Sequence, residues 1–473
     1  AGEKAKGFEI ELKSRLQKSE TQWNKDLLAL RPELQLELLS SLLKRDSGKI
    51  VEGWLKGFRQ RQEPLSAGAW LTLGRQAQTF GLFDEAKLIF TTLVERYSQS
   101  PEAAEALFRR ALVNMRLALW EPAQTDLTAL LENSRYALSA GYWLAQVLKK
   151  GPEKDRARVS EVAQTVIDRF PLSYYGLKLR EELKQPLTLT KPSQGTDARW
   201  LLTAADRQAW ARAKQLMKFG WTREANLEVK ALPWPADPTS LWQLSQLLAD
   251  RGVYQQAFSS HSLLTEGSAE HRLPAELPAY FPKVWESRVN EEAQRQRLSP
   301  YLVWGLMRQE SAFNERATST SAALGLMQLL FSTAKDVASS FSKNLVDPED
   351  LYLPGNNIQF GTKYMGQMID ICKGSVPLAV ASYNAGPGRV QQWFRLRDDL
   401  KIFFEGAGLT KEMMADPMSE LWVEELPIGE PSFYVKAVLR NALLYRWLYS
   451  TPRTGPALGL GQWRDLQSRV PSS

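Results

Sequence analysis

Cysteine and histidine are scarce in this sequence, which has one cysteine and two histidines among 473 residues. The single cysteine, Cys372, excludes an intramolecular disulfide. No histidine lies near it in the sequence, so it is more typical of a small buried side chain than of a catalytic thiol. His261 and His271 are too few to favour a zinc site or a serine–histidine triad. We therefore expect no metal and no cofactor.

Long apolar runs are missing as well. No window approaches eighteen consecutive apolar residues, so no transmembrane span is predicted. The first residues do not resemble a signal peptide, which leaves either a cytosolic protein or a processed mature chain. The net charge of +7 favours anionic partners such as nucleic acid, acidic lipid or a cell-wall polymer. No basic run or stacked aromatic motif of a nucleic-acid module is present, so nucleic acid is not an expected partner.

The chain is predicted to be all-α, because apolar residues recur at helical spacing and no segment shows sustained alternation. Within residues 1–190 the hexapeptide Gly81–Ala86 is echoed thirty-seven residues later by Ala118–Ala123. A further echo, Gly252–Ala257, lies in the next region. This period is close to that of tetratricopeptide-like helical hairpins, which stack into a superhelix with a concave face.

Clusters of proline, glycine and serine predict where the domains end. We expect an α-superhelical domain at residues 1–190 and a helical linker domain at 191–280. The last domain is expected at 281–450, followed by a loosely ordered tail at 451–473.

A predicted helix that begins after Ser299 ends its apolar face on a carboxylate, Glu310. The apolar residues before it recur at three- and four-residue spacing: Leu302, Val303, Leu306 and Met307. Glu310 takes the next position on that face. Burial there would raise its pKa towards neutrality and suit it to be a general acid. The alternative is a glutamate at a helix end that points to water.

Five short segments give this carboxylate its context, over about a third of the chain. They are Arg308–Ser311, Gly325–Gln328, Asn357–Tyr364, Tyr383–Gly386, and Glu424–Pro427 with Tyr434 and Val435. In this order they resemble the motifs of the soluble lytic murein transglycosylases, whose catalytic domain is similar to goose-type lysozyme. The resemblance implies a lysozyme-like, mainly helical catalytic domain behind a helical superhelix.

The resemblance also implies a substrate and a reaction. The substrate is the glycan strand of peptidoglycan, cleaved at the β-1,4 bond between N-acetylmuramic acid and N-acetylglucosamine. The C6 hydroxyl of the muramic acid replaces water and leaves a 1,6-anhydro end. Glu310 would act first as acid and then as base, and the substrate's 2-acetamido group would take the place of a second carboxylate.

The remaining site residues follow from the same motifs. Tyr383 would donate to the acetamido group, Asn384 would shape the turn after it, and Tyr434 would line the cleft. Ser319 matches a serine near the acetamido and C6 region. Gln328 would bind the acid or the sugar, although a glutamine satisfied by backbone groups is an equal alternative.

Glu424 matches the second glutamate of the family and would position Glu310 or the substrate, with Glu425 as the rival assignment. Three departures from the family pattern stand out. Leu330 takes the place of a cleft-lining methionine, and Ala322 takes the place of a glycine. Residues 387–423 contain an insertion that we expect to close over one end of the cleft.

Two other functions remain open. A hydrolytic lysozyme on the same domain would need a second acid, for which Asp336 and Asp347 are candidates. A non-catalytic scaffold would use only the superhelix. The implied murein substrate indicates a periplasmic location. Expected partners are glycan strands and the proteins of a wall-remodelling complex.

Overall fold

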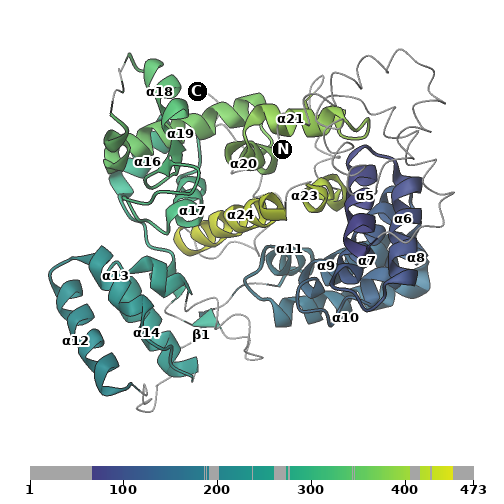
Figure 1. Cartoon of the computed structure of the whole chain (residues 1–473), viewed down its shortest axis with the longest axis horizontal. Helices are drawn as coiled ribbons and strands as arrows, with labels where there is room; N and C mark the ends of the chain where they lie inside the picture. Colours follow the sequence, from purple (N-terminus) through teal and green to yellow (C-terminus); the bar gives the residue numbers. More distant parts are fainter. Residues whose placement is uncertain are drawn as a thin grey trace. The chain divides into compact units, whose positions relative to one another are not determined.

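The computed structural model describes residues 66–185, 187, 189–190, 202–236, 238–259, 273–274, 277–342, 345, 347–404, 416–426 and 429–450. These residues are almost entirely helical (Figure 1), which confirms the all-α prediction. Strands occur in this part of the chain only as two short pairs. The parallel pair joins β1 (Leu189–Thr190) to β2 (Leu273–Pro274), and the antiparallel pair joins β3 (Ala323–Leu324) to β4 (Leu329–Leu330). The predicted tail at 451–473 lies outside the described residues.

The chain divides into two compact units. The described residues of unit 1 lie within 1–156, 392–402 and 417–427, and those of unit 2 lie within 157–391, 403–416 and 428–473. The boundary at residue 156 falls inside α10 (Glu153–Arg169). Of the predicted insertion at 387–423, residues 392–402 and 417–423 belong to unit 1. The predicted domain limits at residues 190, 280 and 450 stay predictions.

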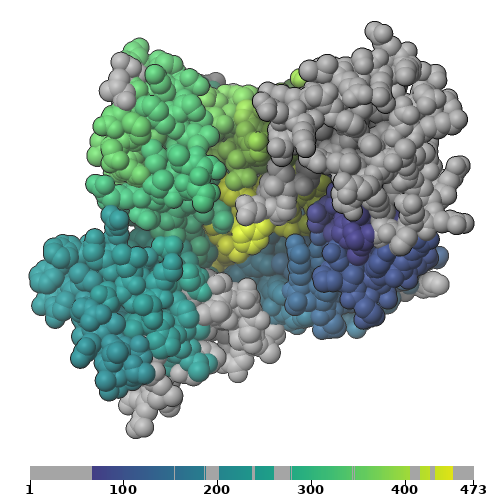
Figure 2. Space-filling view, in the orientation of Figure 1, coloured from purple at the N-terminus to yellow at the C-terminus, as the bar shows by residue number. Residues whose placement is uncertain are grey.

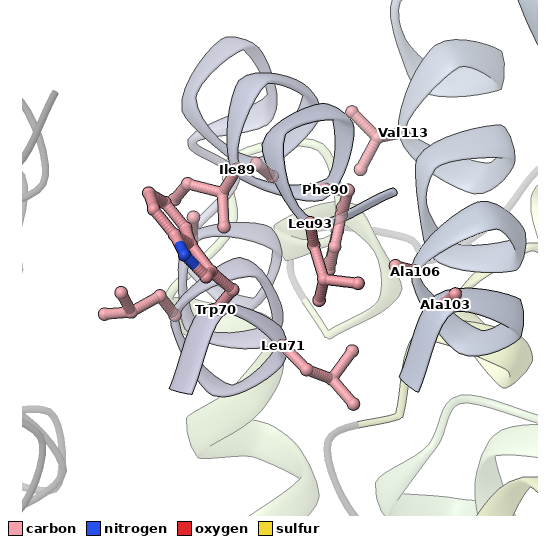
Figure 3. Close-up of a cluster of buried hydrophobic side chains, with 11 residues drawn as sticks. Trp70, Leu71, Ile89, Phe90, Leu93, Ala103, Ala106 and Val113 are labelled. Atoms are coloured by element: carbon pink, nitrogen blue, oxygen red, sulfur yellow. The ribbon is translucent and has the colours of Figure 1, made fainter. Parts of the chain in front are cut away.

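Unit 1 is a series of antiparallel hairpins in which each helix contacts the next. Its main helices are α5 (Ala67–Thr79), α6 (Phe83–Arg96), α7 (Pro101–Arg116), α8 (Trp120–Thr128) and α9 (Ala137–Lys150). Their buried side chains interlock (Figure 3), with Trp70 and Leu71 of α5 beside Phe90 and Leu93 of α6. A Cβ atom on Gly74 would lie 2.3 Å from the Phe90 ring, so only glycine permits this close approach.

The hairpin prediction is confirmed by a backbone motif that recurs at each predicted repeat. The turn residue has a positive φ of 70° at Gly81, 55° at Ala118 and 75° at Gly252. The N–H group after it donates to the carbonyl five residues back, at 2.8–2.9 Å. This is the C-terminal cap in which a left-handed residue satisfies the last carbonyls of a helix. The structure adds a fourth copy at Gly220, where φ is 75°.

In all four copies the alanine five residues after the turn is completely buried. These alanines are Ala86, Ala123, Ala225 and Ala257. The small side chain lets the second helix of each hairpin lie close to the first, which is the reason the repeat keeps alanine there.

Unit 2 begins with helices that continue the hairpin pattern. They are α11 (Tyr174–Glu182), α12 (Ala204–Lys218), α13 (Thr222–Lys230), α14 (Pro238–Asp250) and a further helix described from Tyr254 to residue 259. Helices α12 to α14 share one apolar core and are drawn in teal (Figure 2). No helix in the described part of the chain has both the length and the apolar composition needed to cross a bilayer.

The rest of unit 2 surrounds α17 (Pro300–Ser311) and α24 (Gly429–Tyr449), which pack along each other. Around them lie α16 (Glu286–Arg295), α18 (Phe331–Ser339), η2 (Pro348–Tyr352), α19 (Pro354–Ile371), α20 (Val376–Ala385) and the first part of α21 (Pro387–Arg395). Gly305 makes the central contact possible, because a Cβ there would lie 3.0 Å from the Ala442 nitrogen of α24. The close packing fixes the end of α17, which carries Glu310, against α24.

Candidate active site

Glu310 is the penultimate residue of α17 and lies partly buried between this helix and α24. The Tyr434 hydroxyl of α24 donates a hydrogen bond to its Oε1 atom. Burial raises the pKa of Glu310 to about 7, and the bond from Tyr434 offsets part of that rise. Within the described residues no cation forms an ion pair with Glu310. The carboxyl group is therefore half protonated near neutral pH, as the apolar face of the helix predicts.

The chain leaves α17 through two consecutive residues in the left-handed region, Ala312 with φ 48° and Phe313 with φ 63°. This conformation is costly for residues that carry a Cβ and persists only where the surroundings hold it. One such contact is made by the residue before them: the Ser311 hydroxyl donates a hydrogen bond to the Leu326 carbonyl oxygen at 2.9 Å. It joins the end of α17 to the loop at 325–328.

That loop is held in turn by Asn357 of α19. Its amide group donates to the carbonyl oxygens of Leu324 at 2.9 Å and Leu351 at 2.8 Å, and its side-chain oxygen accepts from the Met327 N–H at 2.7 Å. Gly325, with φ 75°, leaves no room for a Cβ, which would lie 2.3 Å from the Asn357 amide. The motif at 357–364 therefore contacts the motif at 325–328 directly, through the Asn357 side chain.

Gln328 turns its amide group towards the backbone. It donates to the carbonyl oxygens of Ala317 at 3.0 Å and Gly325 at 2.9 Å, with its own φ at 47°. The amide N–H groups of Gln328 are thus hydrogen-bonded to the backbone, as the alternative predicts. The residue also lines the cleft together with Glu310. Its predicted contact with the acid or the sugar stays a prediction.

Tyr383 is buried on α20, and its hydroxyl donates to the Met327 carbonyl oxygen at 2.8 Å. Its ring lies 5.1 Å from that of Tyr364, centroid to centroid. Burial, and then the negative charge of Glu310, raise the pKa of Tyr383 well above its ordinary value. Tyr383 is thus close enough to Glu310 to respond to its charge, and it supports the loop that carries Gln328. The neighbouring Asn384 is exposed at the end of the same helix.

Two other predicted residues have contrasting positions. Ser319 lines the cleft, and its hydroxyl accepts from the backbone N–H groups of Ser321 at 3.2 Å and Ala323 at 3.0 Å. Leu330 caps α18, is 44% exposed and is not part of the cleft lining. The structure therefore brings Glu310, Ser319 and Gln328 to one cleft, with Tyr434 and Tyr383 beside it.

The cleft has a volume of about 870 Å³ and polar walls from several elements. Sequence reasoning missed several of its residues: Arg223, Gln255, Arg316, Thr318, Glu349 and Tyr352. Arg223 of α13 and Gln255 of the helix that begins at Tyr254 come from the region predicted to be only a linker. No motif marks them, because their place in the cleft depends on how the hairpins pack on the end of α17. The Thr318 and Tyr352 hydroxyls, 2.6 Å apart, share a hydrogen bond at the cleft wall.

Glu424 and Glu425 both lie in unit 1. The Ser139 hydroxyl donates to Glu424 at 3.2 Å. Glu425 accepts two bonds from Arg116, at 3.1 and 2.7 Å, and one from Arg397 at 2.8 Å. Burial alone would raise the pKa of Glu425, but the two arginines lower it below its ordinary value. These contacts give Glu425 a structural role in unit 1, and the site role of Glu424 stays a prediction.

The candidate second acids of a hydrolase are exposed. Asp336 lies on α18 and Asp347 caps η2, and neither lines the cleft. The carboxylate that does line it with Glu310 is Glu349. In the described part of the chain, no group of three or more histidine, cysteine, aspartate or glutamate side chains is arranged to hold a metal ion.

Comparison with known proteins adds a family and a fold. Residues 287–403 match the family model of the Transglycosylase SLT domain. The soluble lytic murein transglycosylase of Salmonella typhimurium is 25% identical over 406 residues, which cover 77% of this chain and 57% of the relative. The putative soluble lytic murein transglycosylase of Haemophilus influenzae is 29% identical over 71% of this chain and 51% of its own length. The chain thus spans between half and three fifths of these relatives.

Two solved structures share the fold. An inactive glutamate-to-glutamine mutant of the lytic transglycosylase Slt from Pseudomonas aeruginosa has a TM-score of 0.65 at 23% identity, covering 88% of this chain and 63% of that one. The 70 kDa soluble lytic transglycosylase of Escherichia coli has a TM-score of 0.61 at 19% identity, covering 93% of this chain and 67% of the other. These likenesses establish the fold on which the site is built.

Proposed function

We propose that this protein is a lytic transglycosylase of peptidoglycan. Residues 287–403 match the transglycosylase SLT domain, and the chain is similar to soluble lytic murein transglycosylases. The proposed enzyme cleaves the β-1,4 bond between N-acetylmuramic acid and N-acetylglucosamine and forms 1,6-anhydro ends. The observation that carries the proposal is Glu310, a carboxyl group with a pKa of about 7 that opens on a polar cleft of about 870 Å³.

The first step needs a proton on the leaving oxygen as positive charge grows at the sugar ring. Glu310 is protonated in a large fraction of molecules at and below pH 7 and supplies that proton. The bond from C1 to the glycosidic oxygen breaks, and the carbonyl oxygen of the 2-acetamido group bonds to C1. The product with a free 4-hydroxyl leaves, and an oxazolinium ion remains on the muramic acid. A second carboxylate is not required for this step.

In the second step Glu310, now ionised, accepts the proton of the C6 hydroxyl. The C6 oxygen attacks C1, and the bond from C1 to the acetamido oxygen breaks. The result is a 1,6-anhydro ring and a reprotonated Glu310, ready for the next cycle. An acceptor within the same sugar is already in position, which removes the entropic cost of binding a water molecule.

The other residues would position the acid and the sugar. Tyr434 orients the Glu310 carboxyl group by its hydrogen bond. Tyr383 supports the loop that carries Gln328, and Ser319 faces the same cleft. Further substrate contacts are proposed for Tyr383 with the acetamido group and for Leu330, Asn384 and Glu424.

The test is mass analysis of the products released from purified murein sacculi. The intact protein is compared with Glu310→Gln, which removes the proton donor and keeps the shape. Muropeptides one water lighter than the hydrolysed species, absent with the variant, are the expected result. An unchanged product pattern with Glu310→Gln on folded protein would refute the proposed mechanism.

A hydrolytic lysozyme is the second candidate, because Glu349 lines the same cleft and is a possible second acid. Its products would carry reducing ends, and Glu349→Gln would then abolish their release. Anhydro products that persist with Glu349→Gln would exclude this mechanism.

A periplasmic location follows from the proposed substrate. The basic chain would bind the anionic wall, and the helical hairpins would contact glycan strands or proteins of a wall-remodelling complex. Sedimentation of the protein with purified sacculi at increasing salt tests the charge contribution. Binding that does not weaken with salt would contradict it.

A further inference from the structure

Arg308, two residues before Glu310 on α17, is a partly buried cation held by aromatic rings. Its guanidinium carbon lies 3.7 Å from the centroid of the Phe258 ring and 4.7 Å from that of Phe281. Its Nε atom donates to the Tyr280 carbonyl oxygen at 3.1 Å. Among the described residues no carboxylate pairs with it. The ring faces therefore replace the anion that a buried arginine usually needs.

A second contact lies just after Glu310. The Phe313 ring is 5.5 Å from that of Tyr254 and 6.2 Å from that of Phe258, both in edge-to-face geometry. Phe313 has a positive φ of 63°, as described above, so its backbone depends on such external contacts. The helix that begins at Tyr254 thus contacts the chain on both sides of Glu310.

This helix lies outside the matched domain at 287–403, in the region that the sequence marks only as a linker. From these contacts we propose that Phe258 and Arg308 are positioning residues for Glu310. Phe258 holds Arg308 on one side and Phe313 on the other, and so fixes the last turn of α17. The inference rests on the proposed function, because it assigns Glu310 as the acid.

The physical consequence concerns water. Partial burial lowers the pKa of Arg308 to about 9, because the charged form is less stable where water is partly excluded. Without the Phe258 ring the Arg308 guanidinium loses its nearest aromatic partner, so its solvated state becomes more stable than its packed state. The last turn of α17 then loosens and Glu310 becomes more hydrated than it is at the wall of the cleft. A more hydrated carboxyl group has a lower pKa and is a less available acid at neutral pH.

A substitution at Phe258 removes none of the ionisable groups around Glu310, and of these it is Arg308 that contacts Phe258. These groups are Tyr434 of α24, Tyr383 of α20 and, along the cleft, Arg223, Arg308, Arg316, Glu349 and Tyr352. A shift in the pH profile of a Phe258 variant therefore reports a change in the hydration of Glu310 or in the position of Arg308 beside it.

The experiment compares Phe258→Leu with Phe258→Tyr, which keeps the ring. Phe219→Leu is the matched control, because Phe219 is 69% exposed at the turn between α12 and α13. kcat and KM are measured across pH on purified murein glycan strands with the full chain. We expect Phe258→Leu to lower kcat about tenfold or more, since a small displacement of a catalytic group has a large effect on rate. The alkaline limb of its profile should move to lower pH, while the other two variants match the unsubstituted protein.

Two results would overturn the inference. The first is a Phe258→Leu profile equal to that of the unsubstituted protein. The second is a lower rate, with an unmoved alkaline limb, that is accounted for by a loss of folded protein measured by circular dichroism. Glu310→Gln is assayed in parallel. If it stays active, the proposed function fails; if it is inactive while Phe258→Leu is normal, only the positioning role fails.

Discussion

Glu310 in unit 2, which is partly buried, and Glu425 in unit 1, which is buried, are glutamates with opposite surroundings. Glu310 has a tyrosine hydroxyl as its partner, and its pKa rises to about 7. Glu425 has two arginines, Arg116 and Arg397, and its pKa falls below the ordinary value. Burial acts on both in the same direction. The difference comes from the paired cations, which outweigh burial at Glu425, whereas no cation among the described residues forms an ion pair with Glu310.

The comparison separates two uses of a buried carboxylate. Unit 1 repeats the paired arrangement at Glu105, where bonds and charges from Arg75 and Arg109 outweigh burial and lower the pKa. Such groups stay ionised and hold helices together. Glu310 keeps a proton near neutral pH, which is of no structural benefit but is what proton donation requires. A buried carboxylate without a cation, beside a cleft, is thus the better guide to chemistry.

The largest expected effect comes from Glu310→Gln, which tests the catalytic half of the comparison. We expect the rate on glycan strands to fall by roughly 10² to 10⁴-fold, the usual contribution of a general acid. The free energy of unfolding near neutral pH should not fall, because the substitution removes a carboxylate that burial disfavours. Retained activity, or a marked loss of stability, would contradict the assignment.

Glu425→Gln tests the structural half. It removes the carboxylate that pairs with the buried Arg397 and the partly buried Arg116, and Asp399 is the other carboxylate that pairs with them among the described residues. We expect a loss of roughly 3 kcal/mol in the free energy of unfolding, measured by urea denaturation. Asp398→Asn is the control on the same segment, because Asp398 is 94% exposed and should change stability little. Equal effects from the two substitutions would remove the contrast.

The pH dependence of stability should have opposite signs at the two sites. Between the ordinary pKa of 4.5 and about 7, folded Glu310 binds more protons than it does in the unfolded chain. Its contribution to stability is therefore present at low pH and decreases as pH rises through this window, by roughly 3 kcal/mol in all. Glu425, with its lowered pKa, contributes stability above pH 4.5 that is lost as pH falls through the folded value.

The measurement is the free energy of unfolding against pH for the unsubstituted protein, Glu310→Gln and Glu425→Gln. The difference between Glu310→Gln and the unsubstituted protein should grow from pH 4.5 to 7 in favour of the variant. A difference that is flat over this range would mean that Glu310 titrates as an ordinary exposed glutamate.

The smallest effect is expected from Tyr434→Phe. The Tyr434 hydrogen bond lowers the pKa of Glu310, so its removal should raise that pKa and move the alkaline limb of activity to higher pH. We expect the rate to fall about tenfold, because the carboxyl group also loses its orientation. Kinetics across pH provide the measurement, and a limb that moved to lower pH would show that Tyr434 acts by excluding water instead.

The two units also differ in how much the sequence predicts. The hairpin signature, with its turn residue and its alanine, is local, and it matches the backbone at Gly81, Ala118 and Gly252. The copy at Gly220, where Trp221 and Thr222 follow the same turn residue, was not identified from the sequence. The apolar face of α17 predicts a buried Glu310, and the structure shows this residue partly buried. These features repeat within one or two turns of helix, so side-chain spacing alone encodes them.

The cleft depends on contacts that no local spacing encodes. Arg223 and Gln255 enter it from a region that the sequence marks only as a linker, and Phe258 contacts Arg308 across fifty residues of chain. The partners of Glu425 are similarly remote, since Arg116 lies 309 residues away. The roles predicted for Ser319, Asn384 and Glu424 rest on motif resemblance and stay predictions.

The sequence by itself determined the helices, their hairpin turns and the position of one carboxylate on an apolar helix face. The reason is that helix periodicity, capping and turn geometry act between residues a few positions apart. Only the tertiary structure decided which buried glutamate keeps its proton and which pairs with arginine. A pKa depends on the dielectric and the charges within a few ångströms of the group, and those neighbours come from distant parts of the chain.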